Sequence, residues 1–232
     1  MARCLWVEVK PIIIGAVTAQ MSGAAMQNAT DRPKDNEVLL VVDVQNDFCP
    51  GGALAVPGGD AVVPVINRLG CDFAHVVLTQ DWHPAGHSSF ASAHPGHAPL
   101  TTIEMPYGAQ ILWPDHCVQG TSGAAFHPGL ELPRAELVLR KGYHAGIDSY
   151  SAFRENDRRT KTGLAAYLRE RGIERVTLCG LATDFCVLYS ALDACEAGFA
   201  ATVVLDACRG IDHEGSLEKA LAAMRDAGVV LF

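Results

Sequence analysis

The sequence predicts an α/β fold with a doubly wound, six-stranded, mostly parallel sheet and helices on both faces. Two observations lead to this prediction. Short apolar runs of the kind that form strands buried on both faces alternate along the chain with segments whose apolar residues keep helical spacing. The chain has 232 residues, 49% of them hydrophobic, which is enough to build the full core of one such domain.

The predicted elements follow one another from residue 37 onward. Strands are expected at residues 38–42, 75–78, 136–140, 175–179, 201–205 and 229–232, and helices at residues 60–69, 160–171, 184–197 and 214–227. Gly198, directly after the third helix, is suited to a C-cap. This alternation of strand and helix is typical of parallel sheets.

Two segments stand outside this alternation. Residues 80–134 are rich in His, Pro and Gly and show little periodicity, and a segment of that length within a domain is usually a functional insertion. Residues 1–36 are predicted to be an N-terminal extension that is disordered or precedes the true start, ahead of a single domain at residues 37–232.

The composition argues against several classes of partner. The formal net charge is -8 and the Lys and Arg residues are scattered, so no basic stripe suits a nucleic acid. The apolar run at residues 11–17 is too short to span a bilayer. Eight cysteines include no CxxC pair, which favours reduced thiols and a cytoplasmic location. Association into a homo-oligomer stays open.

Reactive side chains follow four of the predicted strands. Ligands of such sheets bind beyond the carboxyl ends of the strands, and these four ends carry Asp43, the pair Asp81 and His83, Lys141, and Cys186. Each residue alone is more often structural, because a carboxylate can cap a turn and a Lys can be solvated. Their joint placement at one edge of the sheet predicts a functional site there.

Cys186 is expected on the first turn of the helix at residues 184–197. The N-terminus of a helix stabilises a thiolate and supplies N–H donors for an oxyanion. A carboxylate such as Asp43 can take the proton from the thiol and pass it to a leaving amine, provided that a cation such as Lys141 holds its pKa in a useful range. Cys186, Asp43 and Lys141 together are therefore typical of an amidase that forms a covalent intermediate.

The insertion adds side chains that can bind a metal. Asp81 and His83 lie two residues apart at a strand end, and His116 supplies a third ligand of the right kind. A carboxylate and two imidazoles with open positions suit one divalent transition metal ion, with zinc, iron and manganese all chemically suitable. His87 and Ser89 are candidates for a further ligand, either directly or through water.

Five motifs carry a resemblance to a known family. They are VDVQNDFCPGG at residues 42–52, TQDWHP at 79–84, WPDHCV at 113–118, KG at 141–142 and GLATDFCV at 180–187. In this order they resemble the nicotinamidases of the isochorismatase-like cysteine hydrolase superfamily, and the resemblance extends from residue 37 to residue 232. It implies an isochorismatase-like hydrolase fold and hydrolysis of nicotinamide to nicotinate and ammonia through a cysteine thioester, in NAD salvage, with pyrazinamide as a second substrate.

The resemblance also implies roles for individual residues. Asp43, Lys141 and Cys186 would form the catalytic triad, and the metal held by Asp81, His83 and His116 would bind the ring nitrogen of nicotinamide. A cis peptide bond between Leu181 and Ala182 would direct the N–H groups of Ala182 and Cys186 into an oxyanion hole. Phe48 and Trp113 are expected to enclose the aromatic ring, with Leu54 and Tyr150 as weaker pocket candidates.

Three other functions are compatible with parts of the pattern. Another amidohydrolase of the superfamily, acting on a carbamoyl or ureido substrate, would not need the set of Asp81, His83 and His116. An isochorismatase-type vinyl ether hydrolase would leave Cys186 without a covalent role. A metal-binding or redox module without enzymatic activity would have no reason to place Asp43 and Lys141 beside the cysteine.

Overall fold

A six-stranded sheet forms the centre of the computed structural model, which describes residues 35–232. The predicted N-terminal extension lies outside the described residues except for its last two. The strands are β1 (Glu37–Val42), β2 (His75–Asp81), β5 (Leu137–Lys141), β6 (Arg175–Leu181), β7 (Ala200–Arg209) and β8 (Val230–Leu231). Their order is β5-β2-β1-β6-β7-β8, and every pair of neighbours is parallel. The predicted fold class is confirmed.

The central strand shows why apolar runs form this sheet. All five residues from Val38 to Val42 are almost completely buried, because β1 is paired on both edges, with β2 and with β6, and is covered on both faces. A strand in this position contacts water on neither face, and a continuous run of Val and Leu therefore satisfies it better than an alternating pattern.

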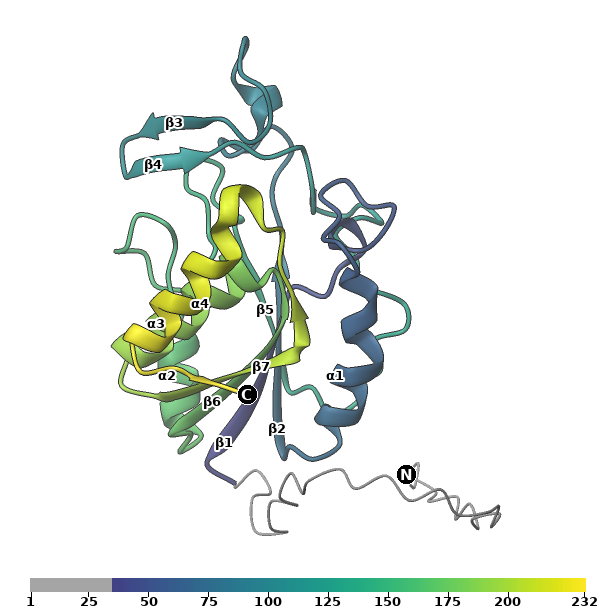
Figure 1. Cartoon of the computed structure of the whole chain (residues 1–232), viewed down its shortest axis with the longest axis vertical. Coiled ribbons are helices and arrows are strands. Elements are labelled where there is room, and N and C mark those ends of the chain that lie inside the picture. Colours follow the sequence, from purple (N-terminus) through teal and green to yellow (C-terminus); the bar gives the residue numbers. More distant parts are fainter. Residues whose placement is uncertain (1–34) are drawn as a thin grey trace, which may run out of the picture. The chain divides into compact units, whose positions relative to one another are not determined.

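The helices cover the two faces of the sheet unequally. Helix α1 (Val63–Gly70) lies on one face, while α2 (Leu164–Glu170), α3 (Leu188–Glu196) and α4 (Ser216–Asp226) lie on the other (Figure 1). The chain leads from β1 outward to β2 and β5 in one direction and from β6 to β7 and β8 in the other. Right-handed crossovers in opposite directions place their helices on opposite faces, and the strand order reverses between β1 and β6.

The insertion contains regular structure that the sequence pattern did not predict. Strands β3 (Thr102–Met105) and β4 (Gly108–Ile111) form an antiparallel hairpin, which lies above the carboxyl ends of the sheet strands (Figure 1). Each of the two strands has four residues and only Gln110 among the eight is buried, so no apolar run marked them. Among residues 35–232, no helix is long and apolar enough to cross a membrane.

Candidate active site

The carboxyl ends of four adjacent strands bring the predicted reactive residues together. Asp43 follows β1, Asp81 ends β2, Lys141 ends β5, and Cys186 comes five residues after β6. Close approach of β6 to β1 depends on Gly180, whose φ is +114° and whose added Cβ would lie 2.1 Å from the carbonyl oxygen of Val42. The predicted convergence at one edge of the sheet is therefore present in the structure.

Lys141 occupies the centre of this group and is completely buried. Its Nζ atom lies 2.9 Å from Oδ2 of Asp43 and 2.8 Å from Oδ1 of Asp81. It also donates to the carbonyl oxygen of Ser149 at 2.8 Å and lies 3.5 Å from Sγ of Cys186. One ammonium group thus contacts both carboxylates and the thiol.

Asp43 is held from its other side by a neighbouring strand. The Thr79 hydroxyl on β2 donates to Oδ1 of Asp43 at 2.6 Å, and the backbone N–H of Asp43 donates back to the same hydroxyl oxygen at 3.1 Å. The residue has a positive φ of 48°, a conformation that Asp tolerates better than most residues. Fixed in this way, the carboxylate presents Oδ2 to Lys141.

Burial and charge set the protonation of these groups. Burial raises the pKa of Asp43 even though the Lys141 ammonium opposes the change. Burial also raises the pKa of the Cys186 thiol well above its ordinary value, and Lys141 offsets only part of this effect. Burial lowers the pKa of Lys141, but Asp43 and Asp81 outweigh it and hold the pKa well above its ordinary value. Cys186 is consequently a neutral thiol beside a base, and not the preformed thiolate that a helix N-terminus would favour.

The backbone around Cys186 differs from the predicted first turn of a helix. Residues Thr183–Val187 form a π-helical turn, with the N–H of Val187 donating to the carbonyl of Ala182, and α3 begins only at Leu188. All five residues of the turn are buried, so no amphipathic period marks where it ends. The peptide bond between Leu181 and Ala182 is cis, as the resemblance implied.

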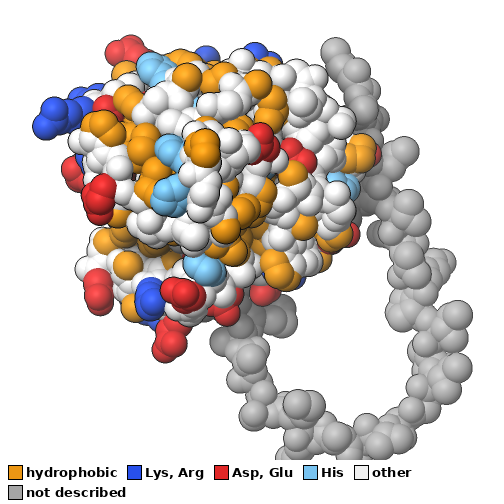
Figure 2. Space-filling view, turned by 90° about the horizontal axis from the view of Figure 1, so that it is seen from above, with side chains coloured by type: hydrophobic (Ala, Val, Ile, Leu, Met, Phe, Trp, Pro, Cys, Tyr) orange, Lys and Arg blue, Asp and Glu red, His pale blue; other side chains and the backbone are white. Residues whose placement is uncertain are grey.

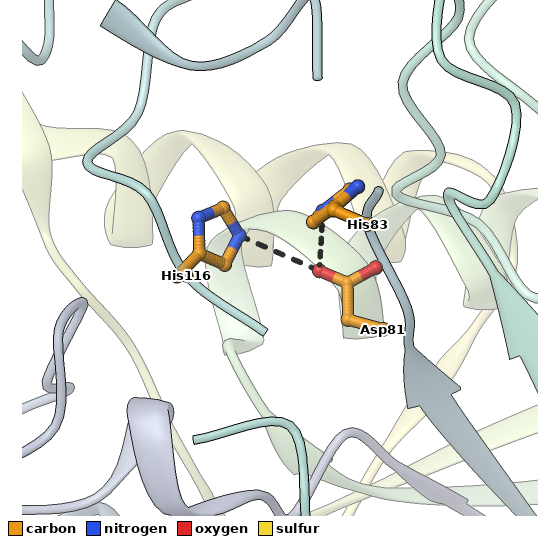
Figure 3. Close-up of side chains that lie close together, drawn as sticks. All are labelled: Asp81, His83 and His116. Atoms are coloured by element: carbon orange, nitrogen blue, oxygen red, sulfur yellow. Dashed lines mark hydrogen bonds and ion pairs between the residues drawn. The ribbon is translucent and has the colours of Figure 1, made fainter. Parts of the chain in front are cut away.

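Asp81, His83 and His116 form a buried group whose geometry could hold a metal ion. Figure 3 shows both imidazole rings directed at the same carboxylate oxygen: Oδ2 of Asp81 lies 3.2 Å from Nε2 of His83 and 3.5 Å from Nε2 of His116. The other oxygen of this carboxylate faces Lys141. Two imidazoles and one carboxylate with open positions suit a divalent transition metal.

Backbone carbonyls orient both histidines. Nδ1 of His83 lies 2.8 Å from the carbonyl oxygen of Gly142, and Nδ1 of His116 lies 2.7 Å from that of Pro114. A carbonyl oxygen accepts only, so each Nδ1 carries a proton, and each Nε2 is left to face Oδ2 of Asp81. With a metal ion bound there, each Nε2 would coordinate it through its lone pair. Gly142 can approach this closely because it lacks a side chain: an added Cβ would lie 2.5 Å from the His83 ring.

An aromatic pocket opens beside the thiol. The predicted walls Phe48 and Trp113 line it, and so do Leu54 and Tyr150. Asp81, His116, Ala182 and Cys186 line it too. So do Asp148, Phe185 and Ile211, which the sequence pattern did not indicate. Phe185 packs edge-on against Trp113 with ring centroids 4.9 Å apart. Ala182 and Cys186 both face the pocket, and their role as oxyanion donors stays a prediction.

The surface above the strand ends has little positive charge near its centre. Figure 2, which looks onto this end of the molecule, shows hydrophobic and histidine side chains toward the middle and the Lys and Arg side chains near the margins. Asp81 and Lys141 of the site do not contribute to this surface, because both are buried.

Comparison with known proteins places this geometry in a family. The chain is 57% identical over 195 residues to a nicotinamidase of Acinetobacter baylyi, covering 84% of this chain and 91% of the relative. A solved Acinetobacter baumanii nicotinamidase and pyrazinamidase has a TM-score of 0.85 and 57% identity, covering 86% of this chain and 96% of that one. The pyrazinamidase of Pyrococcus horikoshii, solved in complex with zinc, has a TM-score of 0.70 and 37% identity, covering 85% and 98%. The model of the isochorismatase domain matches residues 37–232, and the chain belongs to the isochorismatase family.

Proposed function

We propose that this protein hydrolyses nicotinamide to nicotinate and ammonia and also deamidates pyrazinamide. The observation that carries the proposal is the position of Lys141 Nζ, which contacts Asp43, Asp81 and Cys186 at once. Cys186 and two members of the metal-binding group, Asp81 and His116, also line one aromatic pocket. The relatives named above as nicotinamidases support the substrate.

Asp43 acts first as a general base. It takes the proton from the Cys186 thiol, whose pKa burial raises and the carboxylate raises further, and the sulfur attacks the carboxamide carbon. Lys141 stays protonated throughout and compensates the negative charge of the carboxylate and of the developing thiolate. The N–H groups of Ala182 and Cys186 receive the oxyanion, and ammonia leaves with the proton that Asp43 had accepted.

A thioester between Cys186 and the pyridine carbonyl remains. Asp43, again without its proton, takes one from a water molecule, and the hydroxide oxygen attacks the thioester carbon. The carbon–sulfur bond breaks, the proton returns to the thiol, and nicotinate leaves. The product belongs to NAD salvage, and we place the reaction in the cytoplasm.

Asp81, His83 and His116 are the residues that would hold a divalent metal ion, with zinc, iron or manganese as candidates. When bound, such an ion would supply a Lewis-acidic position for the lone pair of the pyridine nitrogen. Phe48 and Trp113 would hold the ring between them. The donor set fits this role because both Nε2 atoms and a carboxylate oxygen point at one place.

Replacement of the nucleophile tests the mechanism. Cys186→Ala should abolish ammonia release from nicotinamide while the fold and the metal content stay those of the wild type. Loss of a covalent nucleophile should lower kcat at least about 100-fold, or roughly 3 kcal/mol. A variant with more than about one hundredth of the wild-type kcat would contradict the covalent mechanism. Iodoacetamide should modify Cys186, and nicotinamide should protect it.

A further inference from the structure

His87, one of the two candidates for a further metal ligand, has both ring nitrogens engaged. The residue is completely buried, and its ring lies against that of His83 with centroids 4.4 Å apart. Nε2 of His87 lies 2.9 Å from the carbonyl oxygen of His144 and 3.2 Å from that of Ile147. Nδ1 lies 2.8 Å from the hydroxyl of Ser89 and accepts the backbone N–H of Ser89 at 3.2 Å.

These partners determine the tautomer of His87. Two carbonyl oxygens can only accept hydrogen bonds, so Nε2 must carry a proton. A backbone N–H can only donate, so Nδ1 must be unprotonated and its lone pair is directed at Ser89. The ring is therefore neutral, with the proton on Nε2, and neither nitrogen has a lone pair available for a metal ion. Although His83, His87 and Asp148 lie close enough together to suggest a second metal group, this hydrogen bonding is unsuited to one.

The two carbonyls that His87 binds belong to a loop that contacts both the metal-binding group and Lys141. In this loop, residues 142–150, the Gly142 carbonyl orients His83 and the Ser149 carbonyl accepts from Lys141. Asp148 and Tyr150 of the same loop line the aromatic pocket. The N–H of Ser88 also donates to the Ala145 carbonyl at 2.9 Å, so two neighbouring residues of the insertion hold the first part of the loop. Gln110 and Trp113 of the insertion hold its end, at Asp148 and Tyr150.

We propose that His87 is a positioning residue that fastens the loop at residues 142–150 to the insertion, and that it is not a metal ligand. Through this loop it sets the orientation of His83, the third hydrogen bond of the Lys141 ammonium and one wall of the pocket. The kinetic part of the proposal rests on the proposed nicotinamidase function. The structural part, that His87 fastens the loop and is not a metal ligand, does not rest on that function.

Two substitutions of His87 distinguish a residue that fastens the loop from a residue that binds the metal. His87→Ala removes the donor to both carbonyls. His87→Gln keeps an N–H donor at nearly the position of Nε2 but offers no imidazole nitrogen to a metal. His94→Ala is the matched control, because Nε2 of His94 also lies 2.8 Å from a backbone carbonyl, that of Ser88, which is outside the loop.

Amide hydrogen exchange and metal analysis of the purified, metal-loaded proteins give the first readouts. In His87→Ala the amides of residues 143–149 should exchange at least about tenfold faster than in the wild type, whereas His87→Gln and His94→Ala should differ from it by less than about threefold. The metal content should be unchanged in His87→Gln and His94→Ala but reduced in His83→Ala. Loss of metal from both His87 variants would identify a ligand, and unchanged loop exchange in His87→Ala would remove the positioning role.

Kinetics and the wild-type ring spectrum complete the test. The kcat/KM for nicotinamide should fall at least about tenfold in His87→Ala and stay within about threefold of wild type in His87→Gln. If His87→Ala does not fold, the ¹⁵N shifts of the His87 ring in the metal-loaded wild type decide the matter. A protonated Nε2 with an unprotonated, metal-free Nδ1 supports the proposal, and any other pattern overturns it. A wild type that is inactive on nicotinamide but shows the predicted exchange and ring spectrum would refute the substrate assignment alone.

Discussion

Asp81 and Lys141 are joined by a contact of 2.8 Å between Oδ1 of the carboxylate and Nζ of the ammonium, while Oδ2 of the same carboxylate faces His83 and His116. One side chain thus belongs both to the metal-binding group and to the charge network around the thiol. The pKa values of the two carboxylates that contact Lys141 are shifted in opposite directions. Burial raises the pKa of Asp81 too, but Lys141 and His83 outweigh it and hold the pKa well below its ordinary value, whereas that of Asp43 is raised.

This shared carboxylate predicts different consequences for two ligand substitutions. His83→Ala should lower the bound metal and raise KM for nicotinamide at least about tenfold, with little change in hydrolysis of a simple activated ester that has no pyridine ring. Asp81→Asn should lower the metal similarly and should also slow ester hydrolysis at least about tenfold, because Lys141 loses one of its two carboxylates. Metal analysis and steady-state kinetics on both substrates measure the difference. Full metal occupancy in His83→Ala would show that the ligand assignment is wrong.

Asp43→Asn tests the general base. The amide cannot accept the proton of Cys186, whose pKa is raised by burial, so kcat should fall about 100- to 10,000-fold. Alkylation of Cys186 by iodoacetamide should slow as well, since less thiolate forms. Thr79→Val, which removes only the hydroxyl that donates to Asp43 Oδ1, should have a smaller effect on both rates. Alkylation of Asp43→Asn at the wild-type rate would mean that another group takes the proton.

The buried carboxyl of Glu155 predicts a pH dependence of stability. Its Oε2 atom has no hydrogen-bond partner, its Oε1 atom lies 3.7 Å from Nε2 of His144, and burial, together with Asp157 and Asp148, raises its pKa to about 7. Below pH 4.5 both the folded and the unfolded protein keep this proton. As the pH rises from 4.5 to 7 the unfolded chain releases the proton first, so the free energy of unfolding falls, and above pH 7 the loss is complete.

Urea unfolding at pH 5 and pH 8 measures this effect. Because the half-exposed His144 and nearby solvent screen part of the charge, we expect the Glu155 contribution to be about 1 to 2 kcal/mol. Glu155→Gln should remove this contribution from the difference in the free energy of unfolding between pH 5 and pH 8. The variant should also be more stable than the wild type at pH 8. Glu170→Gln, which changes an exposed carboxylate on α2, is the control. An unchanged pH difference in Glu155→Gln would show that the carboxyl is already solvated in the folded protein.

The chemistry of the site was predictable because the strands that carry it are marked so clearly. Buried parallel strands are continuous apolar runs, and the polar residues that follow such a run lie at or near the carboxyl edge of the sheet. Asp43, Asp81 and Lys141 could therefore be assigned to one edge before the order of the strands was known. Cys186 required more, because it comes five residues after β6 on a π-helical turn.

Residues supplied by loops were not predictable in the same way. Asp148 and Ile211 line the pocket because their loops fold back over it, and no hydrophobic period fixes the path of a loop. The same reason applies to His87. Its sequence position beside His83 allowed a ligand role, and only the two carbonyl contacts with a segment about 60 residues away indicate another one.

The ring nitrogen of the substrate provides the last prediction. If the group of Asp81, His83 and His116 holds an ion that receives this lone pair, benzamide should be a far poorer substrate than nicotinamide, because it has the same carboxamide and ring shape but no lone pair at that position. Pyrazinamide keeps a nitrogen there and should be hydrolysed. A site built to satisfy one polar atom loses several kcal/mol when that atom is missing, against about 1 kcal/mol for a missing methylene, so we expect kcat/KM for benzamide to be lower by at least about 1,000-fold. Comparable values for benzamide and nicotinamide, measured as ammonia release, would remove the ring-anchoring role. They would instead favour a broader amidase of the same superfamily, in which the walls formed by Phe48 and Trp113 select the ring by shape alone.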